Sequence, residues 1–362
     1  MLSNIREQVD KSLAQFLDKI KTEYHLDLID PILYESIREF TLRKGKRIRP
    51  MLLAISYKGY SKNKKRISPS IYYAATCIEL LHNFMLIHDD IIDRSNLRRG
   101  KPTLHKLLSK AAKTREGEKL GYDLSIIAGD IVYALAIGAF LSINEDLERK
   151  DRALKYFIQT AVFTAMGEFI DTLYGVKKIK NVSEEDVFLN YTLKTARYTF
   201  DCPLVVGAIL AGADKKDTRL LSELGLAVGQ AFQIQDDIIG IFDSQKNIGK
   251  SILSDIAESK KTILVCHADK SLSKSARKNF MRYFNKKTKT YNDLVAIRRI
   301  FLDSGSLEYS ILAIQKRLHR GRAIIKKLKM KPKYLGLIVK SFDQLFEHTR
   351  KIARQYNISS EI

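Results

Sequence analysis

The chain alternates helix-length apolar segments with short polar breaks, and this pattern limits its fold more than any other feature. Gly and Pro, which interrupt helices, number only 18 and 6 among 362 residues. The apolar segments are rich in residues that favour helices. None of them alternates apolar and polar residues in the manner of a half-buried strand. The sequence therefore predicts an all-α protein, a bundle of ten or more long helices.

Polar breaks fall at six places, and none of them has the Gly/Ser- or Pro-rich composition of a linker between domains. They are residues 58–70, 109–119, 177–186, 212–217, 242–251 and 285–293. We therefore expect one helical domain over residues 1–362, with a motif-bearing part at about 40–265 and a more basic helical part at about 269–362. The break at 109–119 is typical of an exposed loop or a helix extension, and we assign it no role.

One segment has the length of a membrane span. Residues 124–143, LSIIAGDIVYALAIGAFLSI, are apolar apart from Asp130. Because an acid in the middle of a span is costly in lipid, we favour a helix buried in the bundle. Three scattered cysteines, Cys77, Cys202 and Cys266, include no CxxC pair. They fit a reducing, cytoplasmic location better than a disulfide framework or a zinc site.

The net charge is +22, and it is concentrated toward the C-terminus. Residues 269–362 hold 23 Lys and Arg against 7 Asp and Glu, a net +16. Nucleic acid, an anionic membrane surface, phosphorylated substrates or a generally basic proteome would each account for such a charge. The charge by itself does not choose among them.

The strongest chemical signal is an acidic cluster inside an apolar run, ELLHNFMLIHDDIIDRSNLRRGKPT at 79–103. On a helix, Asp89 and Asp93 lie one turn apart on nearly the same face, with Asp90 beside them. Like charges at this spacing repel one another, and hard cations such as Mg²⁺ offset that repulsion by bridging carboxylates to phosphate oxygens. A solvated acidic turn is the alternative, but its neighbours here are too apolar.

A second acidic pair and two basic clusters accompany the first. Asp236 and Asp237 again follow an apolar stretch, and basic residues trail them. Two aspartate pairs on separate helices suit a clamp that holds metal and diphosphate from two sides. Basic residues also gather in RKGKRIRP at 43–50 and at Arg98 and Arg99. Arginine presents a two-pronged donor that matches phosphate, although an isolated basic run is more often a solvated face.

Taken in order, these motifs resemble those of the trans-prenyl diphosphate synthases, most closely the short-chain, geranylgeranyl-type members found in archaea. The motifs are GKRIRP (45–50), ELLH (79–82), DDIID (89–93), RRGKPT (98–103), KT (194–195), FQIQDD (232–237) and GK (249–250). Each motif is modest alone, and the ordered set is specific. The resemblance implies helices around a deep central cavity, usually a homodimer, and a Mg²⁺-dependent condensation of isopentenyl diphosphate with an allylic diphosphate.

The resemblance also implies a role for individual residues. Three Mg²⁺ ions per site would be held by Asp89, Asp90, Asp93, Asp236 and Asp237. The allylic diphosphate would be bound by Arg98, Lys194, Lys250 and Lys260. Isopentenyl diphosphate would be received by Lys46, Arg49, His82 and Arg99. The polar residues at the reacting centre would be Thr195, Gln233 and Asp171, beside Lys194.

One departure and one length signal refine this picture. Gly240 stands where the second motif often has a third aspartate, and Asp243, seven residues after Asp236, is a candidate replacement. Phe84 and Met85 lie five and four residues before Asp89, where side chains form the floor beneath the growing chain in this family. A bulky fifth residue with a flexible fourth predicts a C20 product, geranylgeranyl diphosphate, with farnesyl or longer products as the alternative. Ordinary inter-helix packing is the competing interpretation of Phe84.

Three other functions remain to be distinguished. A terpene cyclase also uses DDxxD, but it needs no isopentenyl site and normally carries an Asn/Ser/Glu metal triad, which we do not find. A non-catalytic subunit of a heteromeric synthase tends to lack one aspartate motif, whereas this chain keeps both. A nucleic-acid-binding protein would explain the charge but not two acidic clusters, so we expect no nucleic-acid partner. Weak association with an anionic membrane surface stays open.

Overall fold

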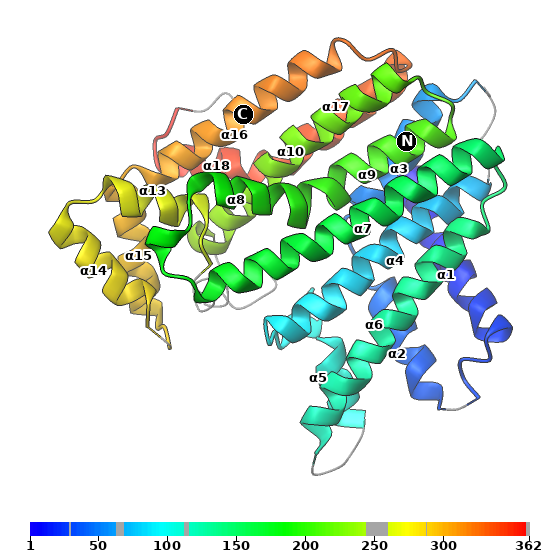
Figure 1. Ribbon diagram of the computed structural model, residues 1–362, viewed down its shortest axis with the longest axis horizontal. Helices are drawn as coiled ribbons and strands as arrows, with labels where there is room; N and C mark the ends of the chain where they lie inside the picture. Colours follow the sequence, from blue (N-terminus) through cyan, green and yellow to red (C-terminus); the bar gives the residue numbers. More distant parts are fainter. Residues whose placement is uncertain (29, 63–68, 112–115, 244–259, 287, 360–362) are drawn as a thin grey trace. The chain divides into compact units, whose positions relative to one another are not determined.

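The structure is a computed structural model that describes residues 1–28, 30–62, 69–111, 116–243, 260–286 and 288–359. Almost all of the described chain is helical (Figure 1). The all-α prediction is therefore confirmed. The chain divides into two compact units. Unit 1 comprises residues 1–157, 203–214 and 330–334, and unit 2 comprises residues 158–202, 215–329 and 335–362. The single domain expected over 1–362 stays a prediction.

Unit 1 contains the N-terminal helices and a short hairpin. Its elements are α1 (Leu2–Glu23), α2 (Pro31–Leu42), α3 (Ile48–Tyr60), α4 (Pro69–Ile92), β1 (Leu97–Arg98), β2 (Lys101–Pro102), α5 (Leu104–Ala111), α6 (Gly117–Leu141), the first part of α7 (Leu147–Val176) and most of α9 (Cys202–Leu210). In α1, apolar residues three or four apart bury one face of the helix. At the start of α2, Asp30 accepts a hydrogen bond from the backbone of Ile32, which caps the helix.

Helices α4 and α6 pack against each other along much of their length (Figure 1). Gly121 of α6 makes a close approach to α5 possible, because a Cβ there would lie 2.4 Å from the backbone oxygen of His105. Among the described residues, α6 is the one helix long and apolar enough to cross a membrane. In its most apolar stretch 44% of the residues are buried. One face of α6 is thus covered, while Ile126, Ile127 and Asp130 on the other face are exposed, so the helix is only partly buried.

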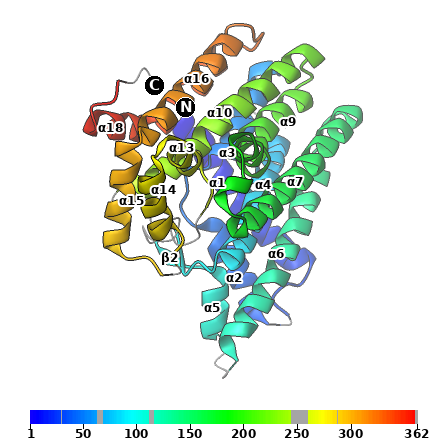
Figure 2. The ribbon, with the colours of Figure 1, turned by 60° about the vertical axis from the view of Figure 1, so that its left-hand side comes forward.

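Among the described residues, one pair of short strands interrupts the helices, and it carries Arg98. After α4 the chain turns through the antiparallel pair β1 and β2, in which Arg98 lies opposite Lys101 (Figure 2). Arg99 and Gly100 both have positive φ, at 56° and 73°, so the turn is left-handed. Strands of two residues leave no alternating pattern in the sequence, which is why periodicity did not predict them.

Unit 2 contains the second half of the helices. Its elements are the rest of α7, η1 (Ile179–Asn181), α8 (Glu184–Asn190), the π-helix η2 (Tyr191–Asp201), α10 (Lys215–Phe242), α13 (Ile263–Ser271), α14 (Lys274–Phe284), α15 (Tyr291–Asp303), α16 (Ser306–Ile325), most of α17 (Pro332–Leu345) and α18 (Glu347–Gln355). Helix α10 packs against η2 and α16. Capping boxes begin α8, at Ser183 and Asp186, and α15, at Thr290 and Asp293.

Candidate active site

The first aspartate motif lies at the C-terminal end of α4 in unit 1. Asp89 and Asp90 are in the last helical turn, and Asp93 follows it, with its backbone N–H bonded to the Asp89 carbonyl at 2.8 Å. The Asp90 side chain is 1% exposed and that of Asp89 is 18% exposed. The helix therefore holds two carboxylates side by side at its end, where a cation is favoured by the helix dipole.

Arg98 of the hairpin grips both of these carboxylates. Its Nε donates to Asp90 Oδ1 at 2.8 Å, and its Nη2 donates to Asp89 Oδ2 at 2.9 Å and to Asp90 Oδ1 at 2.5 Å. Burial lowers the pKa of Arg98, but the charges of Asp90 and Asp89 outweigh burial, so the net pKa is raised. Arg98 is therefore a fixed cation beside the aspartate motif. Its role in binding the allylic diphosphate stays a prediction.

A second group of basic residues lies near the N-terminus of α3. His82 is buried, and its pKa falls well below the ordinary value, first because of burial and then because of the charges of Arg49 and Arg99. Burial also lowers the pKa of Arg99, and the Arg49 charge lowers it further. The structure thus brings together three of the four residues expected to receive isopentenyl diphosphate. Lys46, the fourth, is exposed in the loop before α3.

Arg47, between two of these residues, has a different role. Its side chain is buried, donates to Asp10 at 2.8 Å and pairs with Glu79, which is buried as well. It also donates to the backbone oxygens of Thr41 and Arg43 at 3.1 Å. These contacts tie α1, α2, α3 and α4 together inside unit 1. Arg47 therefore stabilises the fold that positions Arg49.

Phe84 contacts α6 through its ring. The ring centroid of Phe84 lies 5.0 Å from that of Tyr133 and 4.6 Å from that of His88. Burial raises the pKa of Tyr133, and Cys77 raises it further. Phe84 and Met85 are both half-buried. The expected floor residue is thus part of an aromatic pair between α4 and α6, in which Tyr133 is a partner that the sequence analysis missed.

The second aspartate motif lies near the C-terminal end of α10 in unit 2. Gln233 donates to Asp237 Oδ1 at 3.0 Å, and Thr195 of η2 donates to Gln233 Oε1 at 2.5 Å. Tyr191 of η2 donates to the other oxygen of Asp237, Oδ2. The same hydroxyl accepts a hydrogen bond from the Ile263 backbone at 3.0 Å. Thr195, Gln233 and Asp237 therefore form one chain of hydrogen bonds, and Asp236 is exposed beside it.

Lys194 and Asp171 form a second contact in unit 2. Lys194 Nζ lies 2.6 Å from Asp171 Oδ2 and 3.1 Å from Glu168 Oε1, while Asn190 donates to Asp171 Oδ1 at 2.8 Å. Burial raises the pKa of Asp171, but Lys194 and then Lys260 outweigh burial, so the net pKa is lowered. The structure thus places three predicted residues, Asp171, Lys194 and Lys260, in one electrostatic group.

Both groups in unit 2 depend on the π-helix. Lys194 and Thr195 lie in η2, a wide helix of a kind that often occurs at functional sites. Close approach to its neighbours requires glycine at two positions. A Cβ on Gly167 of α7 would lie 2.3 Å from the Lys194 nitrogen, and one on Gly229 of α10 would lie 2.4 Å from the Ala196 Cα. These glycines let the π-helix backbone lie against α7 and α10.

Three residues near these groups were missed by the sequence analysis: Tyr191, Glu168 and Asn190. Glu168 had a usable signal, because it precedes Asp171 by three residues and so shares its face of α7. Tyr191 precedes Lys194 by three residues, but in a π-helix that spacing does not place side chains as it does in an α-helix. The contact of Tyr191 with Asp237 therefore could not be predicted from the sequence.

Two predictions about the second motif have different outcomes. Lys250 lies outside the described residues. Asp243, the candidate for the aspartate replaced by Gly240, lies just beyond α10 and pairs with His348 Nε2 of α18 at 2.6 Å. That contact directs the Asp243 carboxylate to α18, which argues against its use as a third metal ligand.

The donor set of the first motif fits magnesium. Among the described residues no group of three or more His, Cys, Asp or Glu converges as a ready-made metal cage. Magnesium seldom uses such a cage: it is usually bound by one or two carboxylates together with waters and substrate phosphates. The adjacent carboxylates of Asp89 and Asp90 suit this mode of magnesium binding, and Asp237 offers the same kind of ligand in unit 2.

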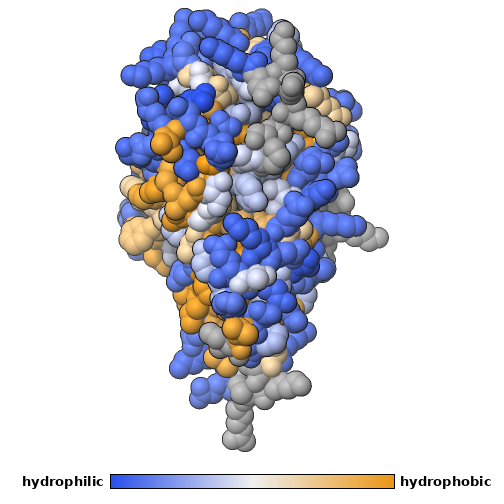
Figure 3. All heavy atoms as spheres, turned by 90° about the vertical axis from the view of Figure 1, so that its right-hand side faces the viewer, coloured by the Kyte–Doolittle hydropathy of each residue, from blue (hydrophilic) through white to orange (hydrophobic). Residues whose placement is uncertain are grey.

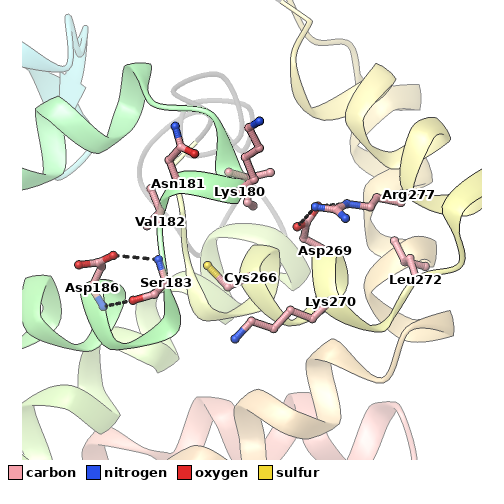
Figure 4. A pocket seen from close by; sticks show the side chains of 11 residues that line it. Lys180, Asn181, Val182, Ser183, Asp186, Cys266, Asp269, Lys270, Leu272 and Arg277 are labelled. Atoms are coloured by element: carbon pink, nitrogen blue, oxygen red, sulfur yellow. Dashed lines mark hydrogen bonds and ion pairs between the residues drawn. The ribbon is translucent and has the colours of Figure 1, made fainter.

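A polar pocket of about 570 Å³ elsewhere in unit 2 has a different character (Figure 4). Its two acidic side chains have partners within the pocket lining. Asp269 binds Arg277 through two hydrogen bonds, and Asp186 and Ser183 form the capping box of α8. Burial raises the pKa of Cys266, at the pocket wall, to about 12, so its thiol keeps its proton. None of the residues predicted to act on substrate lines this pocket.

Comparison with known proteins agrees with this arrangement. The polyprenyl synthetase family model matches residues 30–301. The chain is 32% identical over 288 residues to a geranylgeranyl diphosphate synthase of Sulfolobus acidocaldarius, covering 79% of this chain and 81% of that protein. It is 34% identical over 271 residues to a geranylgeranyl diphosphate synthase of Saccharolobus solfataricus, covering 74% and 75%.

Solved structures show the same fold. A geranylgeranyl pyrophosphate synthase from Corynebacterium glutamicum, complexed with isoprenyl diphosphate and magnesium, superposes with a TM-score of 0.88 at 27% identity, covering 96% of this chain and 99% of that one. A geranylgeranyl pyrophosphate synthetase from Pyrococcus horikoshii gives a TM-score of 0.78 at 26% identity, covering 94% and 96%. Together with the two aspartate motifs and their basic partners, these matches establish that the chain belongs to the polyprenyl synthetase family.

Proposed function

We propose that this protein is a Mg²⁺-dependent trans-prenyltransferase that condenses isopentenyl diphosphate with an allylic diphosphate and releases pyrophosphate. The observation that carries the proposal is the pairing of Asp89 and Asp90 with Arg98 in the same unit as the basic group of Arg49, His82 and Arg99. A metal-dependent enzyme with two diphosphate substrates needs both of these groups. The relatives named above, all synthases of geranylgeranyl diphosphate, support the same reaction.

Both aspartate motifs would hold metal. Asp89, Asp90 and Asp93 would bind Mg²⁺ in unit 1, and Asp236 and Asp237 would bind it in unit 2, with three ions in all. When bound, magnesium supplies positive charge that stabilises the diphosphate as it leaves. Arg98 is already held at the first motif, so it needs little reorganisation to donate to the same diphosphate.

The remaining residues would orient the two substrates. Lys46, Arg49 and Arg99 would hold isopentenyl diphosphate by its phosphates, and the neutral His82 would add a hydrogen bond. Lys194 and Lys260 would donate to the allylic diphosphate, and the dipoles of Thr195 and Gln233 would stabilise the allylic cation. The allylic C–O bond would break, and pyrophosphate would leave with the bonding electrons. The double bond of isopentenyl diphosphate would then attack the cation, and the proton lost as the new double bond forms would pass to the released pyrophosphate.

An assay of pyrophosphate release tests the reaction. We expect release that needs Mg²⁺ and both substrates, and that falls by roughly 100-fold or more in Asp89→Ala. Release from an allylic diphosphate alone would indicate a terpene cyclase. No release in the purified chain, with the substrates and Mg²⁺ saturating, would indicate a non-catalytic subunit. Because the chain keeps both aspartate motifs, we expect release that needs Mg²⁺ and both substrates.

We also propose that the main product is geranylgeranyl diphosphate. Phe84 paired with Tyr133 forms a rigid aromatic barrier between α4 and α6, whereas Met85 beside it is flexible. Chromatography of dephosphorylated products tests the assignment. Phe84→Ala should lengthen the product beyond C20, and Met85→Phe should shorten it toward C15. An unchanged spectrum in both active variants would mean that another part of the chain sets the length.

The assembly proposed here is a homodimer formed through α7. Six apolar residues of this helix recur every three or four positions and are all exposed: Ile158, Val162, Met166, Phe169, Leu173 and Val176. Apolar residues at this spacing form the line of contact between paired helices. A large exposed apolar patch also marks an interaction site. Apolar side chains also gather along one side of the face in Figure 3.

A cytoplasmic location and a weak attraction to anionic lipid complete the proposal. Cys77, Cys202 and Cys266 are buried and are not joined by disulfides, which fits a reducing compartment. The +16 charge of residues 269–362 would favour an anionic surface by about 1 kcal/mol per well-placed basic residue. Salt-sensitive sedimentation with anionic vesicles is the expected result, and equal recovery at low and high salt would contradict it.

A further inference from the structure

An apolar pocket with a basic mouth lies in unit 2 among α10, α16, α17 and the start of α18. None of the residues assigned above to metal or substrate lines it. Its floor is apolar and buried, and consists of Leu224, Val228, Leu318, Phe342 and Phe346. Its volume is about 260 Å³. Because a cavity of about 150 Å³ accommodates benzene, this pocket has room for about ten carbons, the larger part of a fifteen-carbon prenyl chain.

A single glycine keeps the pocket open on the α16 side. A Cβ on Gly321 would lie 3.3 Å from Leu224 Cδ1 and 3.5 Å from Val228 Cγ2. The glycine therefore leaves a gap over α10 that almost any larger side chain would fill. In a well-packed helical core a side chain fills such a groove. Because residue 321 is a glycine, the groove is available to a ligand.

The mouth of the pocket is positively charged. Arg322, Lys326 and Arg350 line it, and Asp343 is the one acid among the lining residues. Asp343 lies 3.9 Å from Arg350, and the lining residues themselves carry a formal net charge of +2. Lys326, at the C-terminal end of α16, is exposed to solvent. An apolar floor below a basic rim is complementary to a molecule with an apolar chain and an anionic head.

We propose that this pocket binds an anionic amphiphile, with the chain over Gly321 and the head between Arg322 and Lys326. A prenyl diphosphate and a fatty acid share this chemistry. The prenyl diphosphate is the expected ligand, and this choice rests on the proposed function, because the enzyme makes and consumes such molecules. The floor residues Leu224 and Val228 belong to α10, the helix that also carries Asp236 and Asp237, so an occupied pocket would press on the helix of the second metal motif.

Calorimetric titration of the full chain in EDTA tests the site, since removing Mg²⁺ weakens diphosphate binding at the aspartates. The probes are farnesyl diphosphate, dodecanoate and, as a neutral control, farnesol. Gly321→Leu should fill the groove, and Lys326→Glu should repel the head. We expect each change to weaken farnesyl diphosphate binding at this site at least tenfold. Farnesol should bind at least tenfold more weakly than farnesyl diphosphate.

Matched variants separate the pocket from general effects. Gly336→Leu makes the same change at a helical glycine with open space around it. Lys327→Glu reverses the neighbouring exposed charge, which does not line the pocket. Both controls should bind as the unaltered protein does. If Gly321→Leu fails to fold by circular dichroism, Lys326→Glu and Lys327→Glu, both on the surface, still decide the question.

The outcomes are distinct. Tighter binding of farnesyl diphosphate than of dodecanoate, lost in the two pocket variants, supports the prenyl assignment. Tighter binding of dodecanoate overturns that assignment and makes the site one for carboxylate lipids. Binding of neither probe, or binding equally affected by Lys326→Glu and Lys327→Glu, overturns the site. Failure of pyrophosphate release would contradict the proposed function alone, because the titration requires no turnover.

Discussion

At the scale of single residues, a hydrogen bond from Tyr191 holds the Asp237 carboxylate of the second aspartate motif. The Tyr191 side chain is 4% exposed, and its hydroxyl links Asp237 on α10 to the Ile263 backbone at the start of α13. Burial and then the charge of Asp237 raise the pKa of Tyr191 well above its ordinary value, so the hydroxyl keeps its proton and donates it. Groups that orient a metal ligand in this way tune its affinity for the metal.

Tyr191→Phe removes this hydroxyl and keeps the ring. We expect Mg²⁺ affinity to fall roughly tenfold, measured by calorimetry with a substrate analogue bound, and the KM for Mg²⁺ to rise accordingly. Tyr309→Phe is the matched control, since it removes a hydrogen bond to another carboxylate, Glu184. Equal losses in both variants would mean that Tyr191 only supports the fold.

His105 should make the free energy of unfolding depend on pH. The residue is fully buried, stacks on Tyr122 at 4.6 Å and lies 3.3 Å from Thr103 Oγ1. Burial, and then the charge of Lys106, lowers the pKa of His105 to about 4, while Glu118 opposes this. Between pH 4 and its unfolded value of about 6.5, the unfolded state binds more protons. The free energy of unfolding therefore rises with pH across this window.

For this reason acid should destabilise the protein partly through His105. Lowering the pH from 7 to 5 should cost about 1–2 kcal/mol through this residue. Urea unfolding of the unaltered protein and of His105→Asn at both pH values isolates the effect, because other histidines contribute equally to the two. A loss of stability on acidification that is the same in both proteins would refute the assignment.

At the scale of elements, the packing of η2 on α7 depends on Gly167. A methyl group there would meet the Lys194 backbone, which cannot move aside as a side chain can. Gly167→Ala should therefore lower stability by about 1–3 kcal/mol and separate Lys194 from Asp171, so that kcat falls more than KM changes. Gly175→Ala, in open space on the same helix, should be neutral or stabilise by up to about 1 kcal/mol. Calorimetric melting and steady-state kinetics measure both; equal behaviour of the two variants would show that the contact is unimportant.

The elements also show what the sequence can predict and what it cannot. Apolar periodicity predicts α4 and α10, and acids in an apolar run predict Asp89, Asp90, Asp236 and Asp237 as functional. The grip of Arg98 on the first pair depends on a turn with two left-handed residues, which leaves no periodic signal. The place of Tyr191 depends on a π-helix, whose spacing no helical template describes. Local propensity gives the helices, whereas contacts between elements need the structure.

At the scale of the whole molecule, the charge and the exposed apolar surface have different distributions. The excess of basic residues is in 269–362, whereas the regular apolar row of α7 lies in residues 158–176. Within that row Phe169 is 71% exposed and Val176 is 85% exposed. A monomer that left such a row in water would forgo the free energy of burying it, about 1.5–3 kcal/mol for each large side chain. A second copy of the chain offers an identical row, as a two-fold interface requires.

Phe169→Glu should therefore break the proposed homodimer. An anion at the centre of an apolar seam loses its water without gaining a partner, and central aromatic residues contribute most to an interface. We expect dimer affinity to fall roughly 30-fold or more. Sedimentation velocity should then give the 41.5 kDa mass of one chain at a concentration where the unaltered protein has twice that mass. Tyr291→Glu changes an exposed aromatic residue outside this row and should remain dimeric. A monomeric unaltered protein, or a Phe169→Glu variant that still dimerises, would place the assembly surface elsewhere or remove it.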